Sequence, residues 1–213
     1  MIRSFFYAAL LLSPLTSGAQ ESATSCTPTP RIPSHNYPGA ANIPNSNNLL
    51  QYNGKAVPAE GQRLVVEGRL RDSRCVPIQG AIIELWQTDP FGNWRLATRE
   101  DLVNPAPVFS GAGRTYSDNN GGFRFITAFP GASKTHSPHV HLRIKPPRMP
   151  EFRTQLYFEN DVRNESDRDY KRLKPLERRR VELRMRPLSD DPNAGYVGEG
   201  EIILPGRIPY RTY

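Results

Sequence analysis

Residues 118–127 read Asp-Asn-Asn-Gly-Gly-Phe-Arg-Phe-Ile-Thr, a turn followed by a β-type run, and this alternation decides the expected fold. Asn and Gly suit tight turns, while aromatic and β-branched residues favour strands. From Gln62 onward similar runs recur at 64–70, 81–87, 139–144, 154–158, 181–185 and 201–204. Only 167–180 has a helix-like composition, and Pro175 interrupts it. Seven or more short strands with so little helix predict an all-β sandwich.

Three of the four histidines, His136, His139 and His141, lie within six residues, and the fourth is His35. His139 and His141 fall on an expected strand, where alternate side chains share one face. They would lie roughly 6–7 Å apart along the backbone, which makes them half of a metal site. Two polar side chains on a solvated sheet face would give the same spacing.

The first 19 residues have the pattern of a secretory signal peptide. Arg3 precedes an apolar run from Phe5 to Leu12, and Ser17-Gly18-Ala19 offers a cleavage site with small residues. The apolar run is too short to span a membrane. We therefore expect cleavage near Ala19, a secreted or periplasmic location and no membrane span.

Export determines how the two cysteines are interpreted. Outside the cytoplasm, Cys26 and Cys75 are expected to form a disulfide, with two free thiols as the alternative. The bond would close a loop of about 50 residues and stabilise the fold by roughly 2–4 kcal/mol. It would also tie an extended N-terminal arm, residues 20–61, to a single domain over residues 62–213.

The chain carries 28 Lys and Arg against 21 Asp and Glu, a formal charge of +7. The excess is concentrated at 168–172 and 178–180. Such a balance favours anionic partners, such as aromatic acids or cell-envelope polymers, and a solvated basic face would give the same charge pattern. An exported protein rarely meets nucleic acid, so none is expected as a partner.

Individual residues on the expected strands and turns also have structural interpretations. Trp86 is expected in the core. Glu84 alternates with Ile83 and Leu85, so we expect it on the opposite face, in solvent or in an ion pair. Asp118 and Asp161 stand next to turns and are expected to cap them.

Five segments, in order, resemble the intradiol ring-cleavage dioxygenases, a family that includes protocatechuate 3,4-dioxygenase and catechol 1,2-dioxygenase. Residues 80–92 read Gly-Ala-Ile-Ile-Glu-Leu-Trp-Gln-Thr-Asp-Pro-Phe-Gly, and the other segments are 118–127, 130–131, 138–142 and 154–161. The resemblance implies a β-sandwich and a non-haem Fe(III) ion held by two tyrosinates and two histidines. It also implies small aromatic substrates of the catechol type, opened with O₂ between the two hydroxyl-bearing carbons.

By this resemblance, His139 and His141 are the histidine ligands and Gln155 lies near the pocket. The tyrosines do not carry over, because Trp94 and Ser133 stand at their positions. The position of the family's active-site arginine, three residues before the first histidine, is occupied by His136. Phenolate is a hard anionic donor suited to Fe(III), whereas indole and a serine hydroxyl are not.

Several consequences of these departures stay open. Another tyrosine could complete the site, and the candidates are Tyr37, Tyr52, Tyr116 and Tyr157. His136 could join the pair, with His35 as a fourth ligand, in a site that suits copper, zinc or Fe(II) better than Fe(III). The fold could also be a non-catalytic binding module of the cell envelope. The leading prediction is oxidative cleavage of a catechol-type compound, with His139 and His141 binding the metal, Gln155 lining the pocket and His136 contacting metal or substrate.

Overall fold

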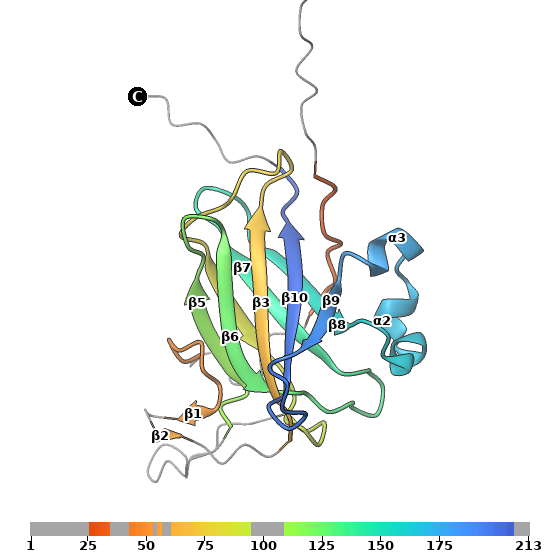
Figure 1. Cartoon of the computed structure of the whole chain (residues 1–213). Helices are drawn as coiled ribbons and strands as arrows, with labels where there is room; N and C mark the ends of the chain where they lie inside the picture. Colours follow the sequence, from red (N-terminus) through yellow and green to blue (C-terminus); the bar gives the residue numbers. More distant parts are fainter. Residues whose placement is uncertain (1–25, 35–42, 53–54, 57–60, 95–108, 207–213) are drawn as a thin grey trace, which may run out of the picture.

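The computed structural model describes residues 26–34, 43–52, 55–56, 61–94 and 109–206 (Figure 1). The strands are β1 (Gln51–Tyr52), β2 (Lys55–Ala56), β3 (Arg63–Arg71), β4 (Ile82–Trp86), β5 (Ala112–Tyr116), β6 (Gly122–Ala128), β7 (His139–Lys145), β8 (Phe152–Phe158), β9 (Glu182–Pro187) and β10 (Tyr196–Ile203). The short helices are η2 (Val162–Ser166), α2 (Arg168–Lys171) and α3 (Pro175–Arg178). The predicted signal peptide, His35 and Tyr37 lie outside the described residues.

Eight strands form one sheet in the order β5-β4-β7-β8-β9-β10-β3-β6, and β1 and β2 pair separately. Neighbouring strands are antiparallel, except that β8 runs parallel to β9 and β10 runs parallel to β3. Only two residue pairs join β8 to β9, so this narrow seam divides the sheet into two halves. The halves pack against each other in a near-closed arrangement, which confirms the predicted all-β sandwich (Figure 1).

The hydrophobic core lies between the two halves, because alternate residues of each strand point inward. Val140 and Leu142 of β7 are fully buried in it, together with Leu64 of β3 and Phe125 of β6. The histidines of β7 alternate with these residues. They therefore lie on the outer face of the half formed by β5, β4, β7 and β8.

All seven β-type runs of the sequence are strands, but β5 and the two-residue strands β1 and β2 were not expected. The sequence of β5, Ala-Gly-Arg-Thr-Tyr, carries a weak strand signal because glycine disfavours strands. Gly113 is required by a close approach of the chain: a Cβ there would lie 2.4 Å from the carbonyl oxygen of Ser46. The helix-like stretch is confirmed as α2 and α3, and Pro175 begins α3.

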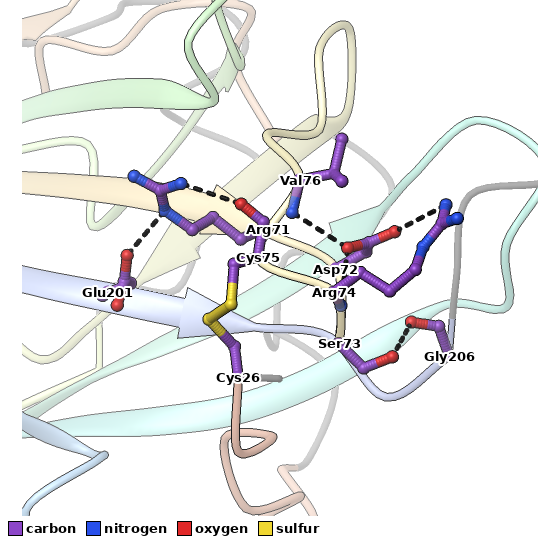
Figure 2. Close-up of a disulfide and its surroundings, with 9 residues drawn as sticks. All are labelled: Cys26, Arg71, Asp72, Ser73, Arg74, Cys75, Val76, Glu201 and Gly206. Carbon is purple, nitrogen blue, oxygen red and sulfur yellow. Dashed lines mark hydrogen bonds and ion pairs between the residues drawn. A yellow bond between two sulfur atoms is a disulfide. The ribbon is translucent and has the colours of Figure 1, made fainter. Parts of the chain in front are cut away.

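The predicted disulfide between Cys26 and Cys75 is formed, with 5.3 Å between the two Cα atoms. Figure 2 shows it between the arm and the turn that follows β3. Buried Asp72 shapes this turn by accepting bonds from the backbone N–H groups of Arg74 and Val76. The disulfide therefore fixes the start of the described arm to a turn that is itself well ordered by hydrogen bonds.

From Cys26 the arm continues along the body through residues 27–34. Thr29 exchanges hydrogen bonds with Ile203 of β10, and the Thr154 hydroxyl of β8 donates to the Pro30 carbonyl. Ile32 is buried in a small cluster beside Tyr157. These contacts carry the arm across β8 and place its last described residues next to the histidine-bearing face.

A second part of the predicted arm is also packed on the domain. Leu49 is fully buried in the main core, and its backbone N–H donates to Ile126 of β6.

The helical segment lies on one side of the molecule, near the seam between β8 and β9 (Figure 1). No helix in the described part of the chain has the length and apolar character needed to cross a membrane.

Candidate active site

The outer face of β4, β7 and β8 bears a cavity of about 400 Å³. The pairing of the three strands places His141 on the cavity floor between two neighbours, Trp86 of β4 and Gln155 of β8. The lining residues come from the arm, the three strands, the loops after β4 and β6, and α2 with its flanks: Pro33, Ser34, Trp86, Thr88, Trp94, Gly131, Ser133, His136, Ser137, His139, His141, Gln155, Arg168, Asp169 and Arg172. The structure thus brings the predicted histidine trio and Gln155 to one cavity, together with Trp94 and Ser133.

His139 and His141 converge in this cavity. Their Nε2 atoms are 3.0 Å apart, and both side chains are buried. Two nitrogens that bind one metal ion at about 2.1 Å, roughly at a right angle, would be separated by about 3.0 Å. A proton shared between the two rings would satisfy the same contact, so the geometry fits a metal ion without requiring one.

The tautomer of His139 is set by the backbone. Its Nδ1 lies 2.7 Å from the carbonyl oxygen of Ser137, which can only accept, so Nδ1 carries the proton and Nε2 has a free lone pair. Burial lowers the pKa of His139, although the bond to Ser137 opposes this shift. The ring is therefore neutral near pH 7, which is the state that binds a metal.

Two indole rings flank His141. Trp86 stacks on it in parallel, with 5.2 Å between ring centroids and an interplanar angle of 6°. Trp94 lies on another side at 5.5 Å and is partly exposed to the cavity mouth. Trp86 is buried as expected, but in a small cluster on the histidine face rather than in the main core. The two rings make the cavity wall suitable for a flat aromatic ligand.

His136 lines the cavity beside His139, with 5.7 Å between the ring centroids. Its Nδ1 is 3.2 Å from Oδ2 of Asp167, a fully buried carboxylate. Nδ1–H therefore donates to Asp167, and Nε2 is the nitrogen left for the cavity. Among the described residues, no three His, Cys, Asp or Glu side chains group closely enough to hold a metal ion. A ligand role for His136 stays a prediction.

Gln155 is buried on the cavity floor and is held from two sides. Its Oε1 accepts a 2.7 Å bond from the Tyr157 hydroxyl, and its Nε2 points to the Pro33 carbonyl at 3.5 Å. Burial, together with nearby Asp167, raises the pKa of Tyr157 well above its usual value. Without a metal ion, Tyr157 is therefore a protonated phenol, and its hydroxyl is engaged by Gln155.

The tyrosine alternatives are not supported where the structure describes them. Tyr116 is exposed at the opposite end of the same face, paired with Ile82. Tyr157 contacts the ring of His139, but its hydroxyl is engaged by Gln155 and Asp167. The side chains of Tyr37 and Tyr52 lie outside the described part. Within that part, no tyrosine side chain lines the cavity, whereas Trp94 and Ser133 do.

Sequence reasoning did not identify Asp167, Arg168 or Arg172 as site residues. Both arginines line the cavity mouth and pair with Asp169, at 3.6 and 3.4 Å. The basic stretch 168–172 was the available signal, but nothing local showed that it would face the cavity. Asp167 has a local signal, because an aspartate before a helix-like run predicts a cap.

The chain is similar to known dioxygenases in sequence and in fold. The model of the dioxygenase family (Dioxygenase_C) matches residues 34–169. The beta chain of protocatechuate 3,4-dioxygenase from Burkholderia cepacia is 30% identical over 109 residues, which is 47% of this chain and 46% of that one. The chain spans about half the length of the curated relatives it matches.

Solved structures share the fold. The dioxygenase domain of a dioxygenase carbohydrate-binding protein fusion from Streptomyces sp. SirexAA-E has a TM-score of 0.66 and 23% identity, over 84% of this chain and 99% of that one. An intradiol ring-cleavage dioxygenase from Tetranychus urticae has a TM-score of 0.66 and 21% identity, over 84% and 95%. Since the family model covers more than half of the sequence, the chain belongs to the intradiol ring-cleavage dioxygenase family.

Proposed function

We propose that this protein is an exported, metal-dependent dioxygenase that opens the ring of a small catechol-type aromatic compound with O₂. One observation carries the proposal: the Nε2 atoms of His139 and His141 converge at 3.0 Å on the floor of a cavity walled by indole rings. Family membership supports the reaction class. The disulfide supports an oxidising compartment, as export would provide.

The described donors fit a transition metal ion, but they are not the donor set typical of the family. His139 and His141 would hold the ion through neutral imidazole nitrogens, which suit Fe(II), copper or zinc. Family membership favours non-haem Fe(III), yet the described lining offers no phenolate. A bound redox-active metal would supply the site where catechol and O₂ meet. Iron is therefore the first metal to test, and copper the second.

The chain's own residues would bind and orient the substrate. Trp94, which is 38% exposed, offers indole surface to an aromatic ring, Trp86 supports the wall by stacking on His141, and the amide of Gln155 is fixed at the cavity floor. His136 presents Nε2, which can accept a proton from a catechol hydroxyl because Nδ1–H is held by Asp167. The arm residues Pro33 and Ser34 close one side against water.

A non-catalytic binding module is the second candidate. The observation that favours it is that Trp94 and Ser133, neither of which forms an anionic oxygen ligand, line the cavity at the predicted tyrosine positions. A third candidate is a histidine-only metal site with different chemistry. Such a site would bind a metal ion, as the proposed dioxygenase does, but would not cleave an aromatic ring.

The test is the metal content of the protein purified from the periplasm without added metal, followed by O₂ uptake with a panel of catechols. We expect near-stoichiometric iron or copper and catechol-dependent O₂ uptake, both lost in the double variant His139→Ala, His141→Ala. Tyr116→Ala, at the far end of the same face, is the control. Metal-loaded protein that consumes no O₂ would contradict the dioxygenase, and protein without metal would favour the binding module.

A further inference from the structure

Asp167 is a buried carboxylate that the proposed chemistry does not use directly. It lies between η2 and α2 and is 1% exposed. Its Oδ1 accepts from the backbone N–H groups of Asp169 and Tyr170, at 2.8 and 3.0 Å, and lies 3.2 Å from the Tyr157 hydroxyl. Its Oδ2 accepts from Ser137 N–H and His136 Nδ1, at 3.1 and 3.2 Å.

Only two of these five contacts are needed to cap a helix. Capping is served equally well by asparagine, serine or an exposed aspartate. Burying a carboxylate is costly unless donors surround it, and here α2 supplies only the two donors at Oδ1. The other three contacts all lead to the cavity, which points to a role beyond the cap.

The Ser137 contact leads to the metal-binding pair. Asp167 Oδ2 holds the N–H of Ser137, and the carbonyl oxygen of the same residue holds Nδ1–H of His139. Because both groups belong to Ser137, fixing its N–H also restricts its carbonyl. The orientation of His139 Nε2 toward His141 therefore depends on Asp167 through one intervening residue.

The other two contacts lead to residues that line the cavity or hold its floor. His136 is turned so that Nδ1 faces Asp167 and Nε2 is left for the cavity. The Tyr157 hydroxyl lies 2.7 Å from Oε1 of Gln155 and 3.2 Å from Oδ1 of Asp167, so the carboxylate and the Gln155 amide share one hydroxyl donor. One side chain thus connects residues from the loop before β7, from β7 itself and from β8.

We propose that Asp167 is the positioning residue of this cavity: it fixes the tautomer and orientation of His136 and, through Ser137, of His139. The inference rests on the proposed function in that the cavity it organises is the proposed metal site. Outer partners of metal-binding histidines fix ring orientation, and their loss typically lowers metal affinity about 10- to 100-fold. Asp167 touches no metal ligand of the β7 pair directly, so it acts through Ser137.

The substitution Asp167→Asn separates capping from positioning. An asparagine can keep Oδ1 on the N–H groups of Asp169 and Tyr170, so the cap of α2 persists. Its NH₂ group then replaces Oδ2 and faces two donors, Ser137 N–H and His136 Nδ1–H. The matched control is Asp161→Asn, which makes the same change in the cap of η2, where the partner is Arg163.

The probe is Co²⁺, titrated into metal-free protein and followed by its visible absorption. We expect Asp167→Asn to bind Co²⁺ about 10- to 100-fold more weakly than wild type, with a changed spectrum, and Asp161→Asn to bind like wild type. Asp167→Asn with wild-type affinity and spectrum would overturn the proposal. Equal weakening in both variants would also overturn it, because it would reveal a general structural effect.

A second measurement needs only the wild-type protein. Long-range ¹⁵N NMR of the histidine side chains should show His136 and His139 both protonated at Nδ1 in the metal-free state. Protonation of His136 at Nε2 would overturn the proposal even if Asp167→Asn fails to fold. Wild-type protein that binds no Co²⁺ but shows both Nδ1–H tautomers would refute the proposed metal site while supporting the positioning role of Asp167.

Discussion

The two ends of one sheet face handle buried polar groups in opposite ways. At one end of the outer face of β4 and β7, Glu84 is fully buried and pairs with Arg114 at 2.6 Å, with Lys145 at 3.4 Å and closely with Arg143. At the other end, the Nε2 atoms of His139 and His141 lie 3.0 Å apart. We call these the charged end and the histidine end.

The difference indicates which end could hold a metal ion. The charged end places three cations around one carboxylate, a net charge of +2 that repels a metal cation, and the side chains of these cations reach solvent. The histidine end brings the Nε2 atoms of two imidazole rings to within 3.0 Å of each other inside a cavity. An external ion is therefore expected to change the histidine end strongly and the charged end hardly at all.

The largest expected effect comes from adding a metal ion. A ligand that binds only the folded state at 1,000 times its Kd stabilises that state by about 4 kcal/mol. We expect Zn²⁺ to raise the free energy of unfolding of wild type and of Glu84→Gln by this order, and to leave His139→Ala, His141→Ala unchanged. Urea unfolding with EDTA or with Zn²⁺ measures it. Equal stabilisation of the double variant would place the ion elsewhere.

Within the folded state, the disulfide should affect the histidine end more than the charged end. Replacing Cys26 and Cys75 by serine should lower the free energy of unfolding by roughly 2–4 kcal/mol, because the unfolded chain regains freedom. In the folded state the arm should loosen where Pro33 accepts from Gln155. Hydrogen exchange should rise more in residues 26–34 and β8 than in β4 and β5, where only the global loss of stability acts. A uniform rise would show that the arm does not serve the histidine end specifically.

Local patterns in the sequence predicted the strands that carry the two ends and the turns beside them. The turn at 118–122 and the alternation in β7 are short-range signals, so the strands and the shared face of His139 and His141 follow from them. The capping roles of Asp118 and Asp161 are also local and are confirmed by their bonds to nearby backbone N–H groups. The disulfide followed from the cysteine count and the expected compartment.

The surroundings of the histidines could not be predicted, because they depend on contacts between segments far apart in the chain. Trp86 reaches His141 through the register of β4 and β7, and Pro33 reaches the cavity because the arm is docked on β8 and β10. Asp167 meets Ser137 and Tyr157 only after the helical segment folds back beside β8. No short-range pattern specifies such pairings, since each requires the sheet order.

Glu84 was expected in solvent or in an ion pair, and the structure shows it buried in an ion pair.

The charged end itself is tested by Glu84→Gln. The variant keeps the shape but leaves three cations without a carboxylate partner, and Arg143 is the least exposed of them. Loss of a buried partner typically costs several kcal/mol, but these cations can turn toward water. We therefore expect a loss of about 2 kcal/mol in urea unfolding, with Zn²⁺ affinity unchanged. A weakened metal site would show that the two ends are coupled.

The smallest expected effect is the pH dependence of the stability that is lost in Glu84→Gln. Burial alone would raise the pKa of Glu84, but its hydrogen bonds to Arg143 and Arg114, with Lys145 nearby, lower it below the ordinary value of 4.5. A carboxyl group whose pKa is lower in the folded state binds fewer protons there than in the unfolded chain. It therefore stabilises the fold above about pH 4.5, and this contribution is lost as the pH falls through the folded-state pKa.

Glu84→Gln lacks this contribution at every pH, so the difference in free energy of unfolding between wild type and variant should shrink between pH 6 and pH 3. Metal-free protein is used, and the histidines are identical in both chains, so their protonation cancels in the difference. A difference that stays constant down to pH 3 would mean that Glu84 contributes through packing rather than through its charge. The charged end would then differ from the histidine end in shape and not in electrostatics.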